Sequence, residues 1–373
     1  MGLFLVMENY RSAPRSCPRV WLYSCLLFLV GIVVVLVAGE LLVRLLVPKE
    51  FYFPINNIYR AVPTDIRYTY KPNYNGIAFG VPLKTNSLGF RGPEWSLAKG
   101  EKTIRIALIG DSHAFGYGVQ FADTVGEKLA TLLSKKCDKK YEVLNFGVAG
   151  YNSRQELAVL REEALRFKPD IIIVVPCNND HDEARIADEQ GFLRTVKKFA
   201  IVDKSINKLS VGVVPWLSNN SRLAFYLLFI KKQYELSNEI PKQLDPRETN
   251  ISDDSKWWMG PLEAGTFPDQ LKNKVYEPLK EIVNEAKKNN IAIVFANFNA
   301  VPDYRRLFAK LSHDENVPSI ELLALFPEAN NWDELVQQFG LGWNDHLNAI
   351  AHERWAQALY HLMKDQQMIR ESQ

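Results

Sequence analysis

The side chains in this sequence that could do chemistry stand at the ends of apolar runs. The run "TIRIALIG" (103–110) is followed directly by Asp111, Ser112 and His113. A serine hydroxyl is a weak nucleophile, and it becomes reactive when an imidazole accepts its proton. His346, in "NDHLN" near the C-terminus, is a candidate for that imidazole. Ser112 and His346 therefore point to nucleophilic catalysis if the fold brings them together.

Two further segments offer hydrogen-bond donors for the oxyanion that forms when a serine attacks an acyl carbonyl. Gly150 follows the apolar run 141–147, and Asn179 follows the run 170–176. The backbone N–H groups of Ser112 and Gly150 and the side-chain amide of Asn179 are suitable donors. A glycine also lets the backbone approach a substrate closely. We therefore expect Gly150 and Asn179 to complete an oxyanion hole.

The group that would orient His346 has two candidates. A histidine base needs a third side chain that holds its tautomer. Asp345 is the nearest acid, but it is adjacent to His346 in the chain, and adjacent side chains commonly diverge. Asn344 could orient the ring through its amide oxygen, as an amide does in Cys-His-Asn proteases. Asp345 could instead serve only as an acidic residue at the start of the following helix.

The apolar runs alternate with segments of helical spacing, which is typical of a parallel sheet covered by helices on both faces. We predict strands at 103–110, 141–147, 170–176 and 291–298, and helices at 123–136, 153–167 and 271–290, the last interrupted by Pro278. In such a sheet, ligands bind outside the carboxyl ends of the strands. The candidate residues that follow three of these strands can therefore meet at one edge.

The rest of the chain is divided by composition. Residues 40–100 are predicted to be an extended linker and N-terminal extension, and residues 49–100 of it are rich in Tyr, Asn and Pro. The α/β domain is assigned to 101–365, with an insertion at 185–270, and 366–373 form a C-terminal tail. Within the insertion, the apolar segment 221–236 is interpreted either as a lid or membrane-facing helix near the substrate site, or as a helix that only packs on the domain.

The N-terminal region contains a candidate membrane anchor. Residues 20–39 carry no charge, and a helix of 20 residues is about 30 Å long, the thickness of a bilayer's hydrocarbon core. The stretch is longer than the apolar core of a usual signal peptide, which is the alternative. Arg11, Arg15 and Arg19 precede it, so the positive-inside rule places residues 1–19 in the cytoplasm. We therefore predict a single-pass membrane anchor and an extracytoplasmic domain.

Composition and spacing exclude other classes. The formal net charge is +2 with acidic and basic residues interspersed, so nothing suggests a nucleic-acid-binding surface. The histidines match no zinc-site spacing, and we predict neither a metal site nor a cofactor. Cys137 and Cys177 are expected to lie a strand length apart, roughly 18 Å, which exceeds the ~7 Å limit for bridging. We therefore predict no disulfide.

Four segments together resemble the blocks of the SGNH, or GDSL-type, hydrolases. They are "IGDSHAFG", "GVAGYN", "CNND" and "DHLN". The resemblance implies a flavodoxin-like three-layer α/β/α fold with Ser112 as the nucleophile and His346 as the base. It also implies that Gly150 and Asn179 complete the oxyanion hole. The segment "TNSLGFRGPE" after the anchor is similar to a membrane-tethered bacterial branch of this family, which implies an anchor in the inner (cytoplasmic) membrane and a periplasmic domain.

These observations predict a membrane-anchored, extracytoplasmic serine esterase. Its substrate would be an O-acetyl or other acyl ester of an envelope glycan or a lipid, cleaved through an acyl-Ser112 intermediate. An O-acetyltransferase is the near alternative, since either water or a sugar hydroxyl can resolve the same acyl-enzyme. The alternative from a different class is a non-catalytic glycan-binding or assembly protein. Its triad would be impaired because Asn344 stands where the family usually has the triad carboxylate.

Overall fold

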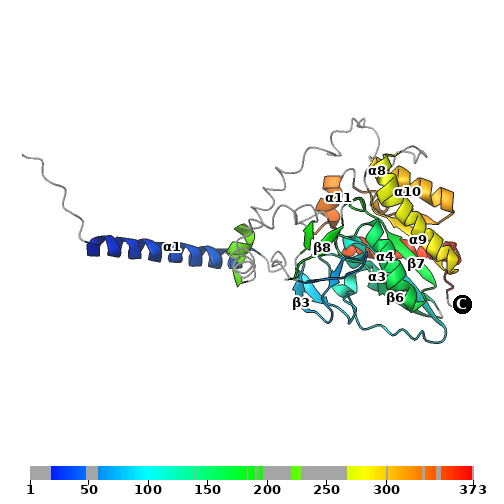
Figure 1. Cartoon of the computed structure of the whole chain (residues 1–373), viewed down its shortest axis with the longest axis horizontal. Coiled ribbons are helices and arrows are strands. Elements are labelled where there is room, and N and C mark those ends of the chain that lie inside the picture. Colours follow the sequence, from blue (N-terminus) through cyan, green and yellow to red (C-terminus); the bar gives the residue numbers. More distant parts are fainter. Residues whose placement is uncertain are drawn as a thin grey trace, which may run out of the picture.

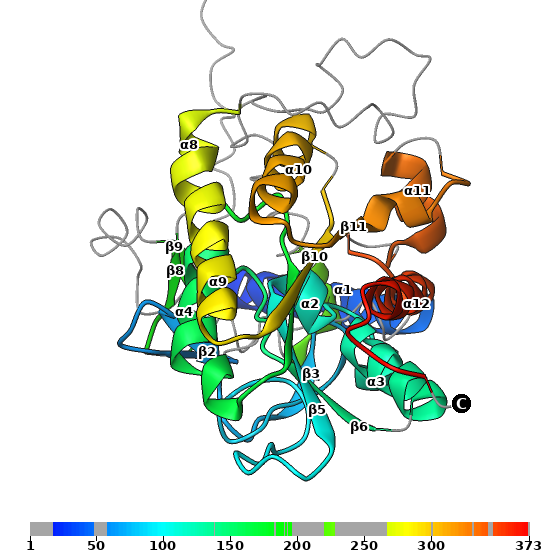
Figure 2. The ribbon, with the colours of Figure 1, turned by 90° about the vertical axis from the view of Figure 1, so that its right-hand side faces the viewer.

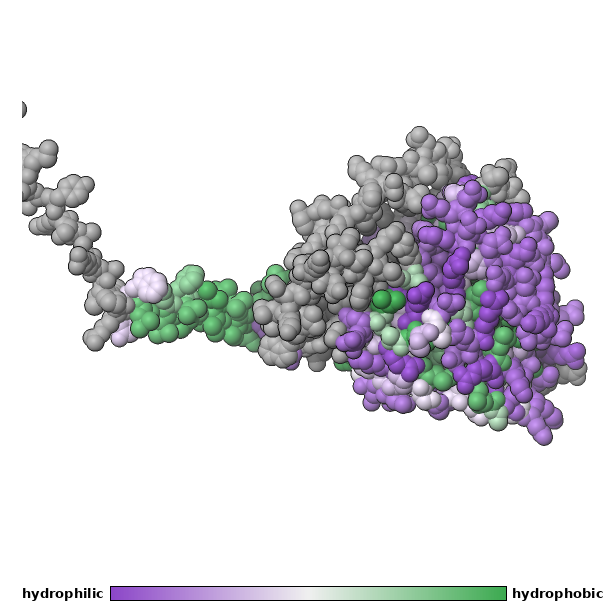
Figure 3. Space-filling view, in the orientation of Figure 1, coloured by the Kyte–Doolittle hydropathy of each residue, from purple (hydrophilic) through white to green (hydrophobic). Residues whose placement is uncertain are grey.

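The N-terminal helix α1 (Pro18–Leu46) extends away from the rest of the described chain (Figure 1). The computed structural model describes residues 18–47, 58–195 apart from 138, 183, 190 and 192, 220–227, and 267–371 apart from 300, 330–331 and 342–345. The most apolar 18 residues within Trp21–Leu46 of α1 have a mean hydropathy of 2.9, and the helix forms an apolar rod beside a mostly polar domain surface (Figure 3). This helix contains the predicted span 20–39 and is long and apolar enough to cross a membrane.

Glu40 of α1 contacts the described part of the predicted insertion. Its carboxylate accepts hydrogen bonds from Ser221 Oγ at 2.7 Å, Leu223 N at 2.9 Å and Arg222 N at 3.1 Å. These residues begin the predicted helix 221–236, of which residues 228–236 lie outside the described residues. The described start of that segment therefore lies against the C-terminal part of α1.

The centre of the domain is a five-stranded parallel sheet in the order β11-β10-β7-β5-β6. Its strands are β5 (Thr103–Gly110), β6 (Lys140–Asn145), β7 (Ile171–Val175), β10 (Ala292–Asn297) and β11 (Ser319–Glu321). In chain order this is the 2-1-3-4-5 arrangement of flavodoxin-like sheets, and it switches direction between β5 and β7. The predicted flavodoxin-like α/β/α class is confirmed by this topology.

Helices cover both faces of the sheet (Figure 2). One face carries α3 (Val125–Lys136), α11 (Trp332–Phe339) and α12 (Ala349–Asp365), and the other carries α4 (Ser153–Glu162), α9 (Glu277–Lys288) and α10 (Pro302–Glu315). Along β5, Ile106 and Leu108 pack towards α3 and α12, whereas Ala107 and Ile109 pack towards α4 and α9. Both faces are buried, which explains the almost continuous apolar run of β5.

The chain before the sheet forms two small antiparallel hairpins that pack on the α4 side. Their strands are β1 (Tyr59–Ala61), β2 (Tyr68–Tyr70), β3 (Asn75–Ala78) and β4 (Val81–Lys84). Tyr68 and Tyr70 are fully buried in the core of that face. The other short elements are α2 (Ser112–Phe115), η2 (Phe121–Asp123), η3 (Ala164–Phe167), β8 (Arg185–Ala187), β9 (Leu193–Thr195), α8 (Asp269–Leu271), η4 (Lys272–Tyr276) and η5 (Leu322–Leu325).

Pro278 marks a change of helix type. The predicted helix 271–290 begins in the structure with the π-helical turn η4, and α9 then starts at Glu277 with Pro278 in its first turn. Proline has no N–H to donate, and its ring clashes with the carbonyl four residues earlier in an α-helix. The wider π turn before Pro278 accommodates the ring, so the helix continues in the same direction.

Candidate active site

Ser112 is the first residue of the single-turn helix α2, directly after β5. Gly110 is required at this corner, since a Cβ there would lie 2.8 Å from the Ala114 Cβ and 2.9 Å from the Val175 carbonyl oxygen. The Asp111 carboxylate caps α2 by accepting a hydrogen bond from His113 N at 3.0 Å. The strand, the glycine and the cap therefore present Ser112 at the carboxyl edge of the sheet.

The buried Arg91 holds the chain that follows α2. Its guanidinium donates to the carbonyl oxygens of Phe115 (3.2 Å), Gly116 (2.7 Å) and Val119 (2.7 Å). These carbonyls lie at the end of a short helix, where they have no intrahelical partners. Arg91 thus fixes the backbone that follows Ser112. Its position in "GFRGPE" gives no sign of this role.

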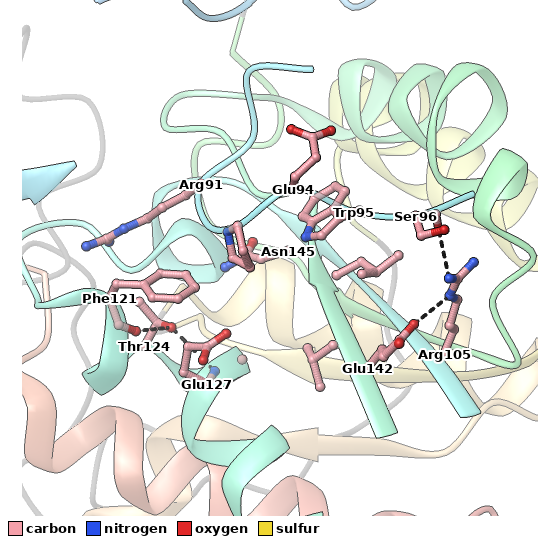
Figure 4. Close-up of a pocket in the computed structure, with 14 residues that line it drawn as sticks. Arg91, Glu94, Trp95, Ser96, Arg105, Phe121, Thr124, Glu127, Glu142 and Asn145 are labelled. Carbon is pink, nitrogen blue, oxygen red and sulfur yellow. Dashed lines mark hydrogen bonds and ion pairs between the residues drawn. The ribbon is translucent and has the colours of Figure 1, made fainter. Parts of the chain in front are cut away.

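A cavity beside this corner is separate from the candidate catalytic residues. It has a volume of about 240 Å³, and Figure 4 shows Arg91, Trp95, Arg105, Glu127 and Asn145 among its lining residues. Neither Ser112 nor His346 lines it. The cavity lies between β6, the start of α3 and the segment that carries Arg91, so we do not assign it to the reaction.

The structure brings Ser112 and His346 together although 234 positions separate them. Ser112 Oγ lies 2.8 Å from His346 Nε2. His346 precedes α12, whose first turn is capped by Asn348 through hydrogen bonds from Ile350 N and Ala351 N. The backbone bond from Leu341 N to His346 O, at 3.0 Å, also fixes this segment. The imidazole is therefore within hydrogen-bonding distance of the hydroxyl that it would activate.

Aromatic rings hold the His346 imidazole from two sides. The Tyr117 ring stacks on it at 4.3 Å between centroids, and the His113 ring stacks at 5.0 Å. His113 itself packs against Phe298 and Trp355, at 4.3 and 6.0 Å. Nothing in the sequence assigned Tyr117 or His113 to the packing of His346. The signal that could have found them is their closeness to Ser112 in the chain, His113 being the next residue and Tyr117 following the cap of α2.

The loops that carry Gly150 and Asn179 reach the same edge. Gly150 has φ +81°, which favours glycine, and Val148 N of the same loop donates to Gly110 O at 3.3 Å. The Asn179 side chain donates to Tyr151 O at 3.4 Å and hydrogen-bonds Asp111. Both predicted donors therefore lie on loops that contact the corner from which Ser112 projects.

A group of buried carboxyl groups lies behind Ser112 on the α4 side. Asp111, Asp180 and Glu156 are each at most 1% exposed. Burial raises the pKa of Asp111. Hydrogen bonds from His113 N and Asn179 and the charge of His346 act in the opposite direction and offset part of this rise. Burial raises the pKa of Asp180 and of Glu156 well above their usual values, and repulsion within the group adds to both shifts. Glu156 and Asp180 therefore favour their neutral, protonated forms.

One set of potential metal-binding side chains occurs in the described part of the chain. One possible ligand atom from each of Asp111, His113 and Cys177 lies within 4.8 Å of the others, and all three residues are buried. Burial, followed by the nearby charges of Asp111 and Asp180, raises the pKa of the Cys177 thiol well above its usual value. The spacing of these residues along the chain matches no established zinc pattern, and we assign no metal to the set. Cys177 and Cys137, for which we predict no disulfide, are not disulfide-bonded.

The predicted triad has two candidates for the residue that orients His346. Asp345 and Asn344, the two candidates for orienting His346, lie outside the described residues. Among the described residues, Asp111 is a carboxyl group whose charge interacts with His346. The Asp111 carboxylate also lies beside the nucleophile, with Oδ2 at 3.2 Å from Ser112 Oγ.

Comparison with known proteins gives distant structural similarity only. No protein-family model matches the chain, and no curated protein matches it. Similar solved structures include a lipase/acylhydrolase from Enterococcus faecalis (12% identity, 72% of this chain, 99% of that chain, TM-score 0.39) and an acetylxylan esterase from Geobacillus stearothermophilus (14%, 70%, 94%, 0.39). A third is a psychrotrophic esterase from a Pseudoalteromonas species (11%, 71%, 98%, 0.39). At these TM-scores the similarity carries no argument about function.

Proposed function

We propose that this protein is a serine ester hydrolase of the SGNH, or GDSL, type that acts through an acyl-Ser112 intermediate. The observation that carries the proposal is the 2.8 Å separation between Ser112 Oγ and His346 Nε2 at the carboxyl edge of a flavodoxin-like sheet. Ligands of such sheets bind at this edge, beside the strand pair where the order reverses. Ser112 follows β5, one member of that pair.

The geometry supports a two-step reaction. His346 Nε2 accepts the proton of Ser112 Oγ as the oxygen attacks the ester carbonyl. The backbone N–H groups of Ser112 and Gly150 and the Asn179 amide are the donors proposed for the resulting oxyanion. His346 then gives the proton to the leaving alcohol. In the second step a water molecule, deprotonated by His346, releases the acid from Ser112.

The contact between Ser112 and His346 supports this proposal over a non-catalytic binding protein. A protein that only binds a glycan has no need for an imidazole nitrogen at 2.8 Å from a serine hydroxyl. His346 is also held between two rings, at 4.3 and 5.0 Å, which favours one orientation of its imidazole. A preorganised base is a requirement of catalysis rather than of binding.

We extend the proposal to the cell envelope. The apolar helix α1 would anchor the chain, and the three arginines before it favour a cytoplasmic N-terminus. The domain would then act outside the cytoplasm, on an O-acetyl or other acyl ester of an envelope glycan or a lipid. An O-acetyltransferase would use the same acyl-enzyme and differs only in the acceptor that resolves it.

The test is covalent labelling of the full chain in detergent with a serine-directed fluorophosphonate, read by intact mass. We expect one adduct on the wild type, and none on Ser112→Ala or His346→Ala. Ser134→Ala and His313→Ala are matched controls, because both side chains belong to helices away from the site. They should label as the wild type does. A folded wild type that forms no adduct, or a Ser112→Ala variant that labels normally, would refute the proposal.

A further inference from the structure

A cationic side chain lies directly on the glycine proposed for the oxyanion hole. Arg185 is the first residue of β8, which pairs with β9 and packs against β1 and β2. A Cβ added to Gly150 would lie 3.0 Å from Arg185 Nη1 and 3.5 Å from its Cζ. The guanidinium therefore covers the loop that follows β6, beside the candidate oxyanion donor. Arg185 itself is only partly buried, so a ligand can reach it.

The groups around this guanidinium do not neutralise it. The Tyr68 hydroxyl lies 3.2 Å from the same Cβ position and donates to Ala149 O. Tyr59 is the other residue whose hydroxyl interacts with the Arg185 charge. Burial raises the pKa of both tyrosines strongly, so both hydroxyls are neutral at physiological pH. Neither of these two hydroxyls therefore supplies a negative charge to Arg185.

Arg185 differs in this respect from the other buried or partly buried arginines of the domain. Arg105 pairs with Glu142 at 2.9 Å, and Arg305 pairs with Glu321 at 3.0 Å. Arg91 has no carboxylate partner, but its guanidinium donates to three backbone carbonyls. Within the described part of the chain, no ion pair or hydrogen bond of the Arg185 guanidinium occurs. A partly desolvated cation without an anion is unfavourable, unless a ligand supplies the anion.

We propose that Arg185 binds an oxyanion group, a carboxylate or a phosphate, carried by the substrate next to the acyl ester. A guanidinium presents parallel N–H donors that match two oxygens of either group. Since Arg185 lies on Gly150, the anion would be held beside the reacting carbonyl. The substrate class is then an acylated acidic carrier, such as a uronic acid or a polyol phosphate, rather than a neutral glycan. The substrate class rests on the proposed esterase function, whereas anion binding at Arg185 does not.

The first experiment measures the preference of the full-length protein in detergent for acidic esters over matched neutral esters. One pair is an O-acetylated methyl glucuronide and the corresponding methyl glucoside. The other pair is acetylglycerol phosphate and monoacetylglycerol. We expect the wild type to favour the acidic member of at least one pair by about 10- to 100-fold in kcat/KM, the effect of one charge-assisted contact. The pair that shows the preference identifies carboxylate or phosphate as the anion.

Arg185→Gln should bring that ratio close to one. The matched control is Arg60→Gln, which removes the same charge from an exposed position of β1 and should keep the wild-type ratio. Two results would overturn the proposal. One is a wild type without preference in either pair. The other is an Arg185→Gln variant that loses activity equally on acidic and neutral esters, which would assign Arg185 to the transition state of every substrate.

A second experiment separates this proposal from the proposed function. In the Ser112→Ala protein, binding of glucuronate and of glycerol phosphate is measured by ligand-observed NMR, with methyl glucoside and glycerol as neutral references. We expect one anion to bind, and this binding to be lost when Arg185→Gln is added. The result decides the role of Arg185 even if no ester is turned over. Absence of binding by both anions, or binding that survives Arg185→Gln, would reject it.

Discussion

The two faces of the sheet surround Ser112 with different chemistry. On the α12 face lie imidazoles and aromatic rings: His113, His346 and His352, with Trp355 between them. On the α4 face lie the buried carboxyl groups of Asp111, Asp180 and Glu156. The first group positions a base by ring packing, and in the second Asp180 and Glu156 favour their protonated forms. Burial thus favours a neutral imidazole at His352 on one face and neutral carboxyl groups on the other, so the two faces should respond to pH in opposite directions.

His352 should make the α12 face sensitive to acid. Burial, with the charges of His113, Arg91 and His346, lowers its pKa to about 3 from 6.5. Below pH 6.5 the unfolded chain binds a proton at His352 that the folded chain does not, so stability is lost as the pH falls towards 3. The loss is up to about 1.4 kcal/mol per pH unit. Glutamine does not titrate, so the stability of His352→Gln relative to the wild type should increase as the pH falls from about 6.5 to about 4.5.

Thermal midpoints of the full chain in detergent at several pH values measure this difference. About 2–4 °C per kcal/mol is expected for a domain of this size. His361→Gln is the matched control, because His361 is an exposed histidine of the same helix. Parallel curves for wild type and His352→Gln over that pH range would contradict the prediction.

Glu156 should give the α4 face the opposite dependence. Burial, then the charges of Asp180 and Asp111, raises its pKa well above 4.5. Above pH 4.5 the unfolded chain has released this proton and the folded chain retains it, so stability falls as the pH rises towards the raised pKa. We expect Glu156→Gln, which cannot titrate, to gain stability relative to the wild type from pH 5 to 8.

The change in the free energy of unfolding that one proton at Glu156 can cause is also limited to about 1.4 kcal/mol per pH unit. Because Glu156 and Asp180 interact, they titrate as a pair, and part of this change belongs to Asp180. Glu162→Gln, a less buried residue of α4, serves as the control and should follow the wild type. If Glu156→Gln loses stability relative to the wild type as the pH rises, the carboxyl group is ionised in the fold, and the comparison between the two faces fails.

The smallest effect is expected at Tyr117. Its ring stacks on His346 at 4.3 Å between centroids. A ring pair of this kind contributes about 0.5–1.5 kcal/mol, so Tyr117→Ala should slow fluorophosphonate labelling of Ser112 by about 2- to 10-fold. Tyr117→Phe keeps the ring and should restore the wild-type rate. An equal loss in both variants would assign the effect to the hydroxyl group instead of the ring.

Much of the sheet was accessible from the sequence because its strands have a strong local pattern. Runs such as 170–176 are apolar at every position, and the segments between them have helical spacing. The rule that ligands bind at the carboxyl edge then placed Ser112 and the loops of Gly150 and Asn179 together. The approach of His346 to Ser112 was expected from the need of a serine nucleophile for an imidazole and from the resemblance of "DHLN" to a family block, and not from any local pattern.

The supporting residues were not accessible, because their environment depends on distant contacts. Glu156 lies in the helix "SRQELAVLRE", where a glutamate is usually exposed to solvent. In the structure its side chain is fully buried. The local sequence around Arg185 and Arg91 is typical of loops and turns. Arg185 contacts Gly150, about 35 positions away, and Arg91 contacts the carbonyls after α2, about 25 positions away. No local pattern carries that information.

The proposed anchor would also limit where the domain can act. In the proposed membrane-bound state, α1 ends at Leu46, and β1 begins at Tyr59. The twelve residues from 47 to 58 can extend by at most about 43 Å at 3.6 Å per residue. Esters within this reach are presented at a high effective concentration, whereas those farther from the bilayer are not sampled.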